Sequence, residues 1–385
     1  SMAKNYTLDS DNFLATEPEL WIYDPRLLGG PGYPEAKLVW RMEVTSPLQL
    51  DMRELVLVDA LHGHIVLNFN QIHTIKQRLV YDTNNIPPAS LPGTSPARFE
   101  GGAATGISDI DLAYDYAGLT YDYYSNIHAR DSIDGHGMTL VSTVRYCPSG
   151  GSCPYANAFW NSTQMVYGAG YASADDVVAH ELTHGVTEYE SGLYYYMQSG
   201  AINEAFSDIW GEFIDLYYDT ATDNDDPSVR WKMGEDIPIG AIRDMANPPA
   251  FGDPDKMSSP IYHCSLMDSG GVHTNSGVAN KAAFLLVDGG IFYGQRINAI
   301  GMTKTAKIFY EVQTNLLTSA SDYQDLGDAL ILACDNLKHD GVTTQTDCVE
   351  VAKTIAATEM HLQPASCNAA PTPFCDLNLL NSTFS

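Results

Sequence analysis

The order of apolar and polar residues divides the chain into a β-rich beginning and a helical end. Near the N-terminus, short apolar and β-branched runs at residues 38–44, 54–59 and 65–69 are separated by turn residues. This pattern predicts a small antiparallel sheet. The turn before the third run contains His62 and His64. We interpret them as part of a turn built around Gly63, with a metal site as the alternative.

Further along, apolar residues recur every three to four positions over 109–126, which predicts a helix, and alternate over 138–144 and 164–167, which predicts strands. Beyond residue 174 helical periodicity dominates. The further helices are predicted at residues 175–189, 201–218, 272–288, 304–317, 323–336 and 347–360. A β-containing part followed by an all-helical part predicts an α+β fold.

The chain length of 385 residues predicts two or three compact units. Residues 84–106 are rich in Pro, Gly, Ser and Ala, which is typical of a boundary. We therefore expect five consecutive parts. They are a sheet module (1–76), a linker (77–106), a β-containing lobe (107–190), a helical lobe (191–363) and a disulfide-pinned tail (364–385).

The charge balance excludes two classes of partner. The chain has 48 Asp and Glu against 20 Lys and Arg, a formal net charge of −28. Such a surface repels phosphate backbones and anionic lipid headgroups, so we expect neither nucleic-acid nor membrane binding. No run of apolar residues approaches the roughly 18–20 needed to span a bilayer.

The cysteines point to an oxidising compartment and hence to a secreted protein. Short spacings predict three local disulfides, with all seven cysteines reduced and buried as the alternative. The predicted pairs are Cys147 with Cys153, Cys334 with Cys348 and Cys367 with Cys375, which leaves Cys264 over.

The segment His180-Glu181-Leu182-Thr183-His184 carries candidate metal chemistry. Residues four apart share one face of a helix, so both imidazoles can bind one zinc ion with Glu181 beside them as a base. Twenty residues on, Glu204 and Asp208 lie one turn apart on the next predicted helix. A catalytic zinc takes three protein ligands, and a ligating imidazole needs an acceptor for its other N–H. Glu204 fits the third ligand and Asp208 the acceptor for His180; the alternative is two solvated helices.

These motifs resemble the thermolysin family of zinc metallopeptidases over residues 107–362. The resemblance implies a two-lobed catalytic domain with the active-site helix between a β-containing and an all-helical lobe. It also implies a monomeric neutral endopeptidase that cleaves protein or peptide substrates before large hydrophobic residues. The segments that carry it, besides those already given, are residues 157–161, 200–208, 252–255, 270–277 and Arg243.

The resemblance also implies roles for single residues. Glu181 becomes the general base, and Tyr195 and His273 become donors to the tetrahedral oxyanion. Asp268 is expected to orient His273. Tyr194 and Tyr196 flank Tyr195, and register alone selects the middle tyrosine.

For substrate binding, the resemblance assigns Asn157, the backbone of Ala158 and Arg243 to the peptide backbone. Val177 and Ile242 match apolar positions of the pocket for the residue after the scissile bond. An ion pair is the alternative for Arg243. Part of the pocket wall is expected to be missing, because residues 167–174 form a shorter segment than in the best-known members.

A calcium site is implied by Asp176, Asp215 and Glu235, whose oxygens suit that ion. The loop at residues 222–226 is expected to add ligands. Arg230 and Lys232 stand where members with a double site carry acids, so we expect one calcium or none. The alternative is an acidic surface loop without metal.

The sheet at residues 38–70 resembles the PepSY module that ends the propeptide of this family. Here only residues 77–106 separate it from the first helix of the catalytic domain, so most of the family's β-rich stretch is absent. Our hypothesis is that the module is retained and packs on the catalytic domain. The competing interpretation is a latent or non-catalytic zinc protein whose module occupies the cleft.

Overall fold

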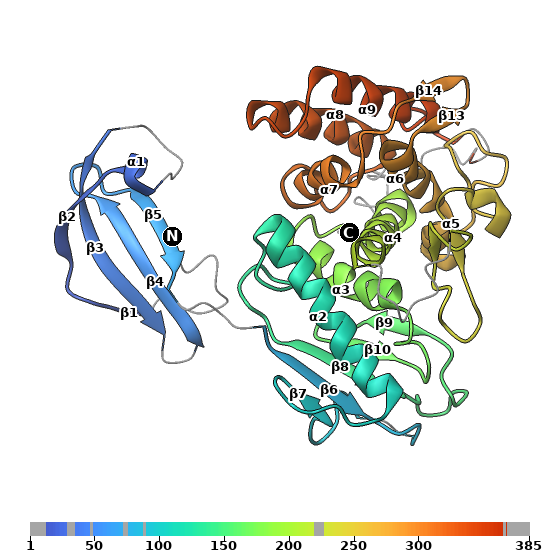
Figure 1. Cartoon of the computed structure of the whole chain (residues 1–385), viewed down its shortest axis with the longest axis horizontal. Coiled ribbons are helices and arrows are strands. Elements are labelled where there is room, and N and C mark those ends of the chain that lie inside the picture. Colours follow the sequence, from blue (N-terminus) through green and yellow to red (C-terminus); the bar gives the residue numbers. More distant parts are fainter. Residues whose placement is uncertain are drawn as a thin grey trace, which may run out of the picture. The chain divides into compact units, whose positions relative to one another are not determined.

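The structure is a computed structural model that describes residues 13–28, 35–46, 49–71, 76–87, 90–218, 227–364 and 367. The chain divides into two compact units, residues 1–75 and 76–385. Figure 1 labels the helices and strands of both.

The first unit contains a five-stranded antiparallel sheet in the order β1-β3-β4-β5, with β2 also paired to β3. The three predicted strands are confirmed as β3, β4 and β5, while β1 and β2 were not predicted. Tyr23, Val39 and Leu57 form its small core. The elements are β1 (Leu14–Ala15), β2 (Glu19–Tyr23), α1 (Pro25–Leu28), β3 (Lys37–Ser46), β4 (Gln49–Asp59) and β5 (Ile65–Asn70).

The second unit begins with a sheet in the order β7-β6-β8-β10-β9. Strand β6 pairs in parallel with β8, and β7 pairs with β6. Strands β6 and β7 lie inside residues 77–106, so the interpretation of that segment as a linker was wrong. Its Pro- and Gly-rich stretch connects two strands of one sheet. The strands are β6 (Arg78–Asp82), β7 (Arg98–Phe99), β8 (Leu140–Val144), β9 (Ala158–Trp160) and β10 (Met165–Tyr167).

Helices make up most of the remainder, and the predicted α+β class is confirmed. The predicted helix at 272–288 is interrupted at Ser276, which lies between α5 and α6, while the positive φ angles of Ser269, Gly270 and Gly271 kink the chain at the start of α5. The predicted helix at 304–317 changes to a π-helical turn at Val312–Leu316. The α-helices are α2 (Ser108–His128), α3 (Asp175–Tyr189), α4 (Met197–Tyr218), α5 (Asp268–Asn275), α6 (Gly277–Asp288), α7 (Met302–Glu311), α8 (Tyr323–His339) and α9 (Gln345–Thr358). Smaller elements are β11 (Lys232–Met233), β12 (Arg243–Asp244), η3 (Pro248–Phe251), β13 (Gly290–Phe292) and β14 (Gln295–Ile297).

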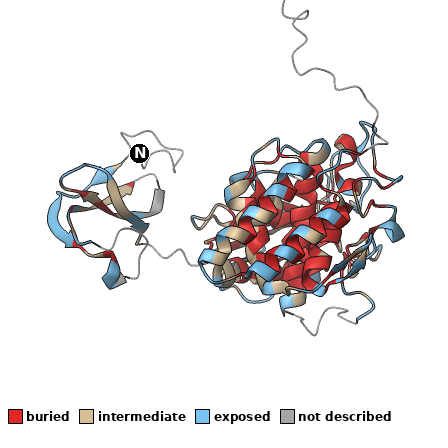
Figure 2. Cartoon of the chain, turned by 90° about the horizontal axis from the view of Figure 1, so that it is seen from above, coloured by how far each residue is buried: buried red, intermediate tan, exposed pale blue. Residues whose placement is uncertain are grey.

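Helices α3 and α4 form the centre of the second unit. α2 and α3 pack against the sheet, and α4 packs on α3 (Figure 1). Figure 2 shows buried positions concentrated in the helices of this unit. A Cβ on Gly211 would lie 2.7 Å from the backbone oxygen of Asp176, so only glycine permits this approach of α4 to α3. Among the largest fully buried side chains are Leu182, Phe206, Trp210, Phe213, Phe309 and Tyr323.

The disulfides agree with the sequence prediction in two of three cases. Cys147–Cys153 and Cys334–Cys348 are bonded as expected. The expected pairing of Cys367 with Cys375 was wrong, because Cys367 bonds Cys264, which lies 103 residues away in sequence but 5.1 Å away between Cα atoms. Cys375 itself lies outside the described residues.

Candidate active site

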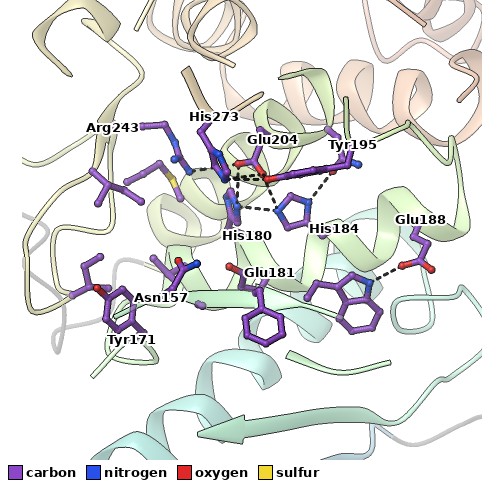
Figure 3. A pocket seen from close by; sticks show the side chains of 18 of the residues that line it. Asn157, Tyr171, His180, Glu181, His184, Glu188, Tyr195, Glu204, Arg243 and His273 are labelled. Atoms are coloured by element: carbon purple, nitrogen blue, oxygen red, sulfur yellow. Dashed lines mark hydrogen bonds and ion pairs between the residues drawn. The ribbon is translucent and has the colours of Figure 1, made fainter. Parts of the chain in front are cut away.

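A cavity of about 590 Å³ opens beside α3 and α4. Its wall combines side chains from both helices with others from β9, β12 and α5. Figure 3 shows several of these side chains around His180, His184 and Glu204. The predicted site residues that line it are Asn157, Ala158, Val177, His180, Glu181, His184, Tyr195, Glu204, Ile242, Arg243 and His273.

Two imidazoles and one carboxylate meet at the floor of this cavity. The Nε2 atoms of His180 and His184 lie 3.1 Å apart, and each lies within 3.5 Å of one Glu204 carboxylate oxygen. Glu204 is completely buried, and its Oε2 atom has no hydrogen-bond partner. A buried carboxylate with an unsatisfied oxygen beside two ring nitrogens fits the donor set of a zinc ion. His180, His184 and Glu204 can therefore hold a metal ion.

The second nitrogen of each imidazole is also held. His180 Nδ1 lies 3.0 Å from Asp208 Oδ1, and His184 Nδ1 lies 2.8 Å from Asn203 Oδ1. These contacts orient both Nε2 atoms toward Glu204. Asn203 was missed in the sequence. The sequence offered a reason to look for it, because the His184 imidazole needs a hydrogen-bond acceptor for its second ring nitrogen just as the His180 imidazole does.

Asp208 is at the centre of a buried polar network. Arg243 donates two hydrogen bonds to its carboxylate, at 2.5 and 2.8 Å, and Asn280 donates a third at 2.7 Å. Burial alone would raise the pKa of Asp208, but Arg243 and His180 together hold it well below its usual range. Asp208 is therefore a stable anion behind His180.

Glu181 lies on α3 next to His180 and is buried. Burial raises the pKa of its carboxyl group to about 7, against the lowering effect of the nearby His184. A carboxyl group in such an environment suits proton transfer near neutral pH.

Tyr195 and His273 also lie at the carboxylate of Glu204. The Tyr195 hydroxyl donates to Glu204 Oε1 and lies 3.0 Å from His273 Nε2. The other ring nitrogen of His273 lies 2.6 Å from Asp268 Oδ1. Among the three consecutive tyrosines, Tyr195 lines the cavity, whereas its neighbours are not part of the wall.

One side of the cavity is apolar. Val177, Ile237 and Ile242 converge on Gly234, each with a side-chain atom 3.3–3.6 Å from where a Cβ of that glycine would stand. Tyr171, Met233 and Ile239 also line the cavity and were not predicted. The positions of Met233 and Ile239 depend on the conformation of residues 231–242, which have no periodic pattern in the sequence.

The predicted calcium residues show a different arrangement. Both carboxylate oxygens of Asp176 accept backbone N–H groups, from Val177 and Gly234. Among the described residues, Asp176, Asp215 and Glu235 do not form a compact three-ligand group. Glu212, which was not predicted, is completely buried with its Oε2 unpartnered. Burial, Asp176 and Glu235 together raise the pKa of Glu212 well above its usual value. The loop at residues 222–226 lies outside the described residues.

Comparison with known proteins tests the resemblance. Two family profiles match, one described as thermolysin metallopeptidase, catalytic domain, over residues 61–188, and one as its alpha-helical domain, over residues 191–354. The chain belongs to the thermolysin family. The expected family and fold class are thus confirmed.

Relatives in this family come from several bacteria. Bacillolysin of Brevibacillus brevis is 44% identical over 269 residues, covering 67% of this chain and 47% of the relative. The zinc metalloproteinase of Renibacterium salmoninarum is 40% identical over 283 residues, covering 68% and 51%. Thermolysin of Alicyclobacillus acidocaldarius is 42% identical over 271 residues, covering 67% and 46%. The chain thus spans about half the length of these relatives.

A solved structure is also similar. The precursor of protealysin, a metalloproteinase from Serratia proteamaculans, superposes with a TM-score of 0.60 at 29% identity. The match covers 74% of this chain and 88% of that structure.

Proposed function

We propose that this protein is a zinc-dependent neutral endopeptidase that hydrolyses peptide bonds in proteins. The observation that carries the proposal is the set of His180, His184 and Glu204 at the floor of a cavity that also holds Glu181. Family membership supports the same chemistry.

Each residue of the site has its own role in the proposed reaction. A zinc ion bound by His180, His184 and Glu204 supplies Lewis acidity toward water and the scissile carbonyl. Glu181 accepts a proton from the attacking water and passes it to the leaving amine. Tyr195 and His273 donate hydrogen bonds to the oxyanion that develops on the substrate.

Substrate binding uses the edge of the sheet. Strand β9 is the last strand of its sheet, and Asn157 and Ala158 at its start line the cavity. An extended peptide can add to such an edge through backbone hydrogen bonds. Val177 and Ile242 then provide an apolar subsite, which supports cleavage before large hydrophobic residues. Arg243 is the candidate donor to a substrate carbonyl.

We also propose one calcium ion near Asp176, Asp215 and Glu235. The unpartnered oxygen of Glu212 and the like charges around it support this, because buried carboxylates need a cation or protons to balance them. Added calcium is expected to raise the thermal unfolding midpoint of the parent but not of Asp215→Asn. A midpoint that does not respond to calcium in either protein would overturn the site.

We propose that the N-terminal unit is retained and packs on the catalytic unit. Leu20 pairs with Trp40 and Ile22 with Leu38, so the four side chains share one face of the sheet, and all are exposed. An exposed apolar face of this kind is typical of a surface that another protein surface covers, which supports the proposed packing.

Residues from Lys76 onward belong to the second unit, in which Lys76 pairs with Asp122 and Arg78 with Glu100. N-terminal sequencing of active protein tests retention. Activity that appears only after loss of residues 1–75 would show that the unit is a removable propeptide.

Secretion is likewise a proposal, and the three disulfides support it. The helices in the described part of the chain include none long and apolar enough to cross a membrane.

Casein degradation tests the proposed activity. We expect activity in the purified protein, loss after treatment with a zinc chelator and recovery on adding Zn²⁺. A protein that binds zinc but degrades no casein in any processed form would instead be a zinc-binding protein.

A further inference from the structure

A second group of metal-ligating side chains lies outside the active site, on the turn between β4 and β5. It consists of Asp59, His62 and His64. Their candidate ligand atoms all lie within 4.8 Å of one another, and the described residues contain one other such group, the active-site triad.

The turn fixes these three residues next to each other. The Asp59 N–H donates to the backbone oxygen of His64, and the Gly63 N–H donates to the backbone oxygen of Asp59. Gly63 has φ +71°, a left-handed conformation that turns the chain between the two histidines. As a result the two imidazole centroids lie 6.0 Å apart.

The distances within the group are close to those of the active-site triad. Asp59 Oδ1 lies 3.1 Å from His62 Nδ1, and Asp59 Oδ2 lies 4.0 Å from His64 Nε2. In the active site, the corresponding distances between ligand atoms are 3.1–3.5 Å. Tetrahedral zinc with bonds of about 2.0–2.1 Å needs ligand atoms roughly 3.4 Å apart. The Asp59–His62 distance is already in this range, while the exposed His64 side chain would have to approach Asp59 more closely.

The carboxylate is anchored and the imidazoles are accessible. Asp59 is buried, and hydrogen bonds from the backbone N–H groups of Leu61 and His62 lower its pKa to about 2. The side chains of His62 and His64 are 70% and 55% exposed. A fixed anion beside two accessible imidazoles is a donor set that zinc and copper prefer.

We propose that Asp59, His62 and His64 form a binding site for a divalent transition-metal ion, Zn²⁺ or Cu²⁺, on the N-terminal unit. The site leaves coordination positions open to solvent. Lys37 limits its affinity, because its Nζ atom lies 3.8 Å from Asp59 Oδ2 and its charge opposes a bound cation.

Substoichiometric Cu²⁺ added to the full-length, zinc-loaded protein provides the test. We expect an electron paramagnetic resonance signal with coupling to two imidazole nitrogens, while zinc content and casein degradation stay unchanged. Unchanged activity locates the copper outside the active site. A signal accompanied by loss of zinc would place the copper there instead and would overturn the proposal.

Three sets of variants make the test specific. His62→Ala and His64→Ala are expected to weaken Cu²⁺ binding by roughly 10-fold or more. His361→Ala is the matched control, since His361 is an exposed histidine beside one carboxylate, that of Asp328, and is expected to bind copper as the parent does. Lys37→Met is expected to bind Cu²⁺ several-fold more tightly. Equal copper binding by the parent, His62→Ala and His64→Ala would overturn the site, whatever the outcome for proteolysis.

Discussion

Arg243 holds both oxygens of the Asp208 carboxylate, and Asp208 in turn contacts the Nδ1 atom of His180. The sequence left two interpretations of Arg243 open, a substrate-binding donor and an ion-pair partner. The ion pair is present, and the same side chain lines the cavity. Arg243 therefore connects the cavity to the orientation of His180, the proposed zinc ligand.

Asp208→Asn is expected to weaken zinc binding about 10–100-fold, the usual effect of losing an outer-shell partner of a ligating histidine. Asparagine keeps an acceptor for His180 but removes the charge that balances Arg243. Competition with a fluorescent zinc chelator measures the change. Asp268→Asn is the control, since it lies behind His273 and should leave zinc affinity as in the parent. Equal zinc affinity in the parent and Asp208→Asn would contradict this account of the network.

Tyr195→Phe is expected to lower kcat about 10²–10³-fold, the usual loss for one oxyanion donor, with a small change in KM. The reason is that its hydroxyl lies at Glu204 and His273 in the cavity. Tyr194→Phe and Tyr196→Phe are matched controls and should retain parental kcat. The assignment fails if either control loses as much activity as Tyr195→Phe, provided that all variants bind one zinc.

His128 predicts a specific pH dependence of stability. Its ring stacks on Tyr310 with centroids 4.1 Å apart, and neither ring nitrogen has a hydrogen-bond partner. Burial, with smaller effects from Lys307 and Arg130, lowers its pKa to about 3. Between that value and about 6.5, the unfolded chain binds a proton that the folded chain excludes. Stability from this group is therefore present above about pH 6.5 and is lost as the pH falls toward 3, by up to about 1.4 kcal/mol per pH unit.

His128→Phe removes the titrating group and keeps the aromatic ring. Urea unfolding at neutral and acidic pH, in a Glu181→Gln background that prevents self-digestion, should show a smaller loss of stability on acidification than in the parent background. Identical losses in the two proteins would exclude His128 as a source of acid sensitivity.

Peptide mapping without reduction is expected to recover Cys264 linked to Cys367. Such a bond closes a loop of 103 residues. In the chain-entropy account, a loop of that size corresponds to about 4.7 kcal/mol of stability. Cys264→Ala should therefore lower the unfolding temperature. A peptide that links Cys367 to Cys375 would restore the pairing predicted from sequence.

Local signals explain which parts of the fold could be predicted. Helix α3 begins and ends where its apolar periodicity does, at Asp175 and Tyr189. Strands β6 and β7 were missed because their pairing is settled by β8, about sixty residues further on, while the local composition indicates a connection. The kink at the start of α5 was missed because periodicity does not register the positive φ angles of residues 269–271.

The same distinction applies to the site. His180 and His184 could be predicted as ligands because their spacing follows helix geometry, and Glu204 because a catalytic zinc takes a third protein ligand and the next predicted helix offers this carboxylate. Asn203 was overlooked although His184 also needs an acceptor, whereas Glu212 could not be identified, since its burial depends on how closely α4 packs on α3 at Gly211. The Cys264–Cys367 bond was missed for a related reason, because only the folded chain brings the two residues together.

The most direct test of the proposed chemistry is the activity of Glu181→Gln, measured together with its zinc content. Glutamine keeps the shape of the side chain and leaves His180, His184 and Glu204 intact, so one zinc per chain should remain bound. Because glutamine cannot accept the proton, we expect peptide hydrolysis to fall by about 10²–10⁴-fold or more. Parental hydrolysis by a zinc-loaded Glu181→Gln protein would contradict the proposal that Glu181 is the base of a zinc endopeptidase.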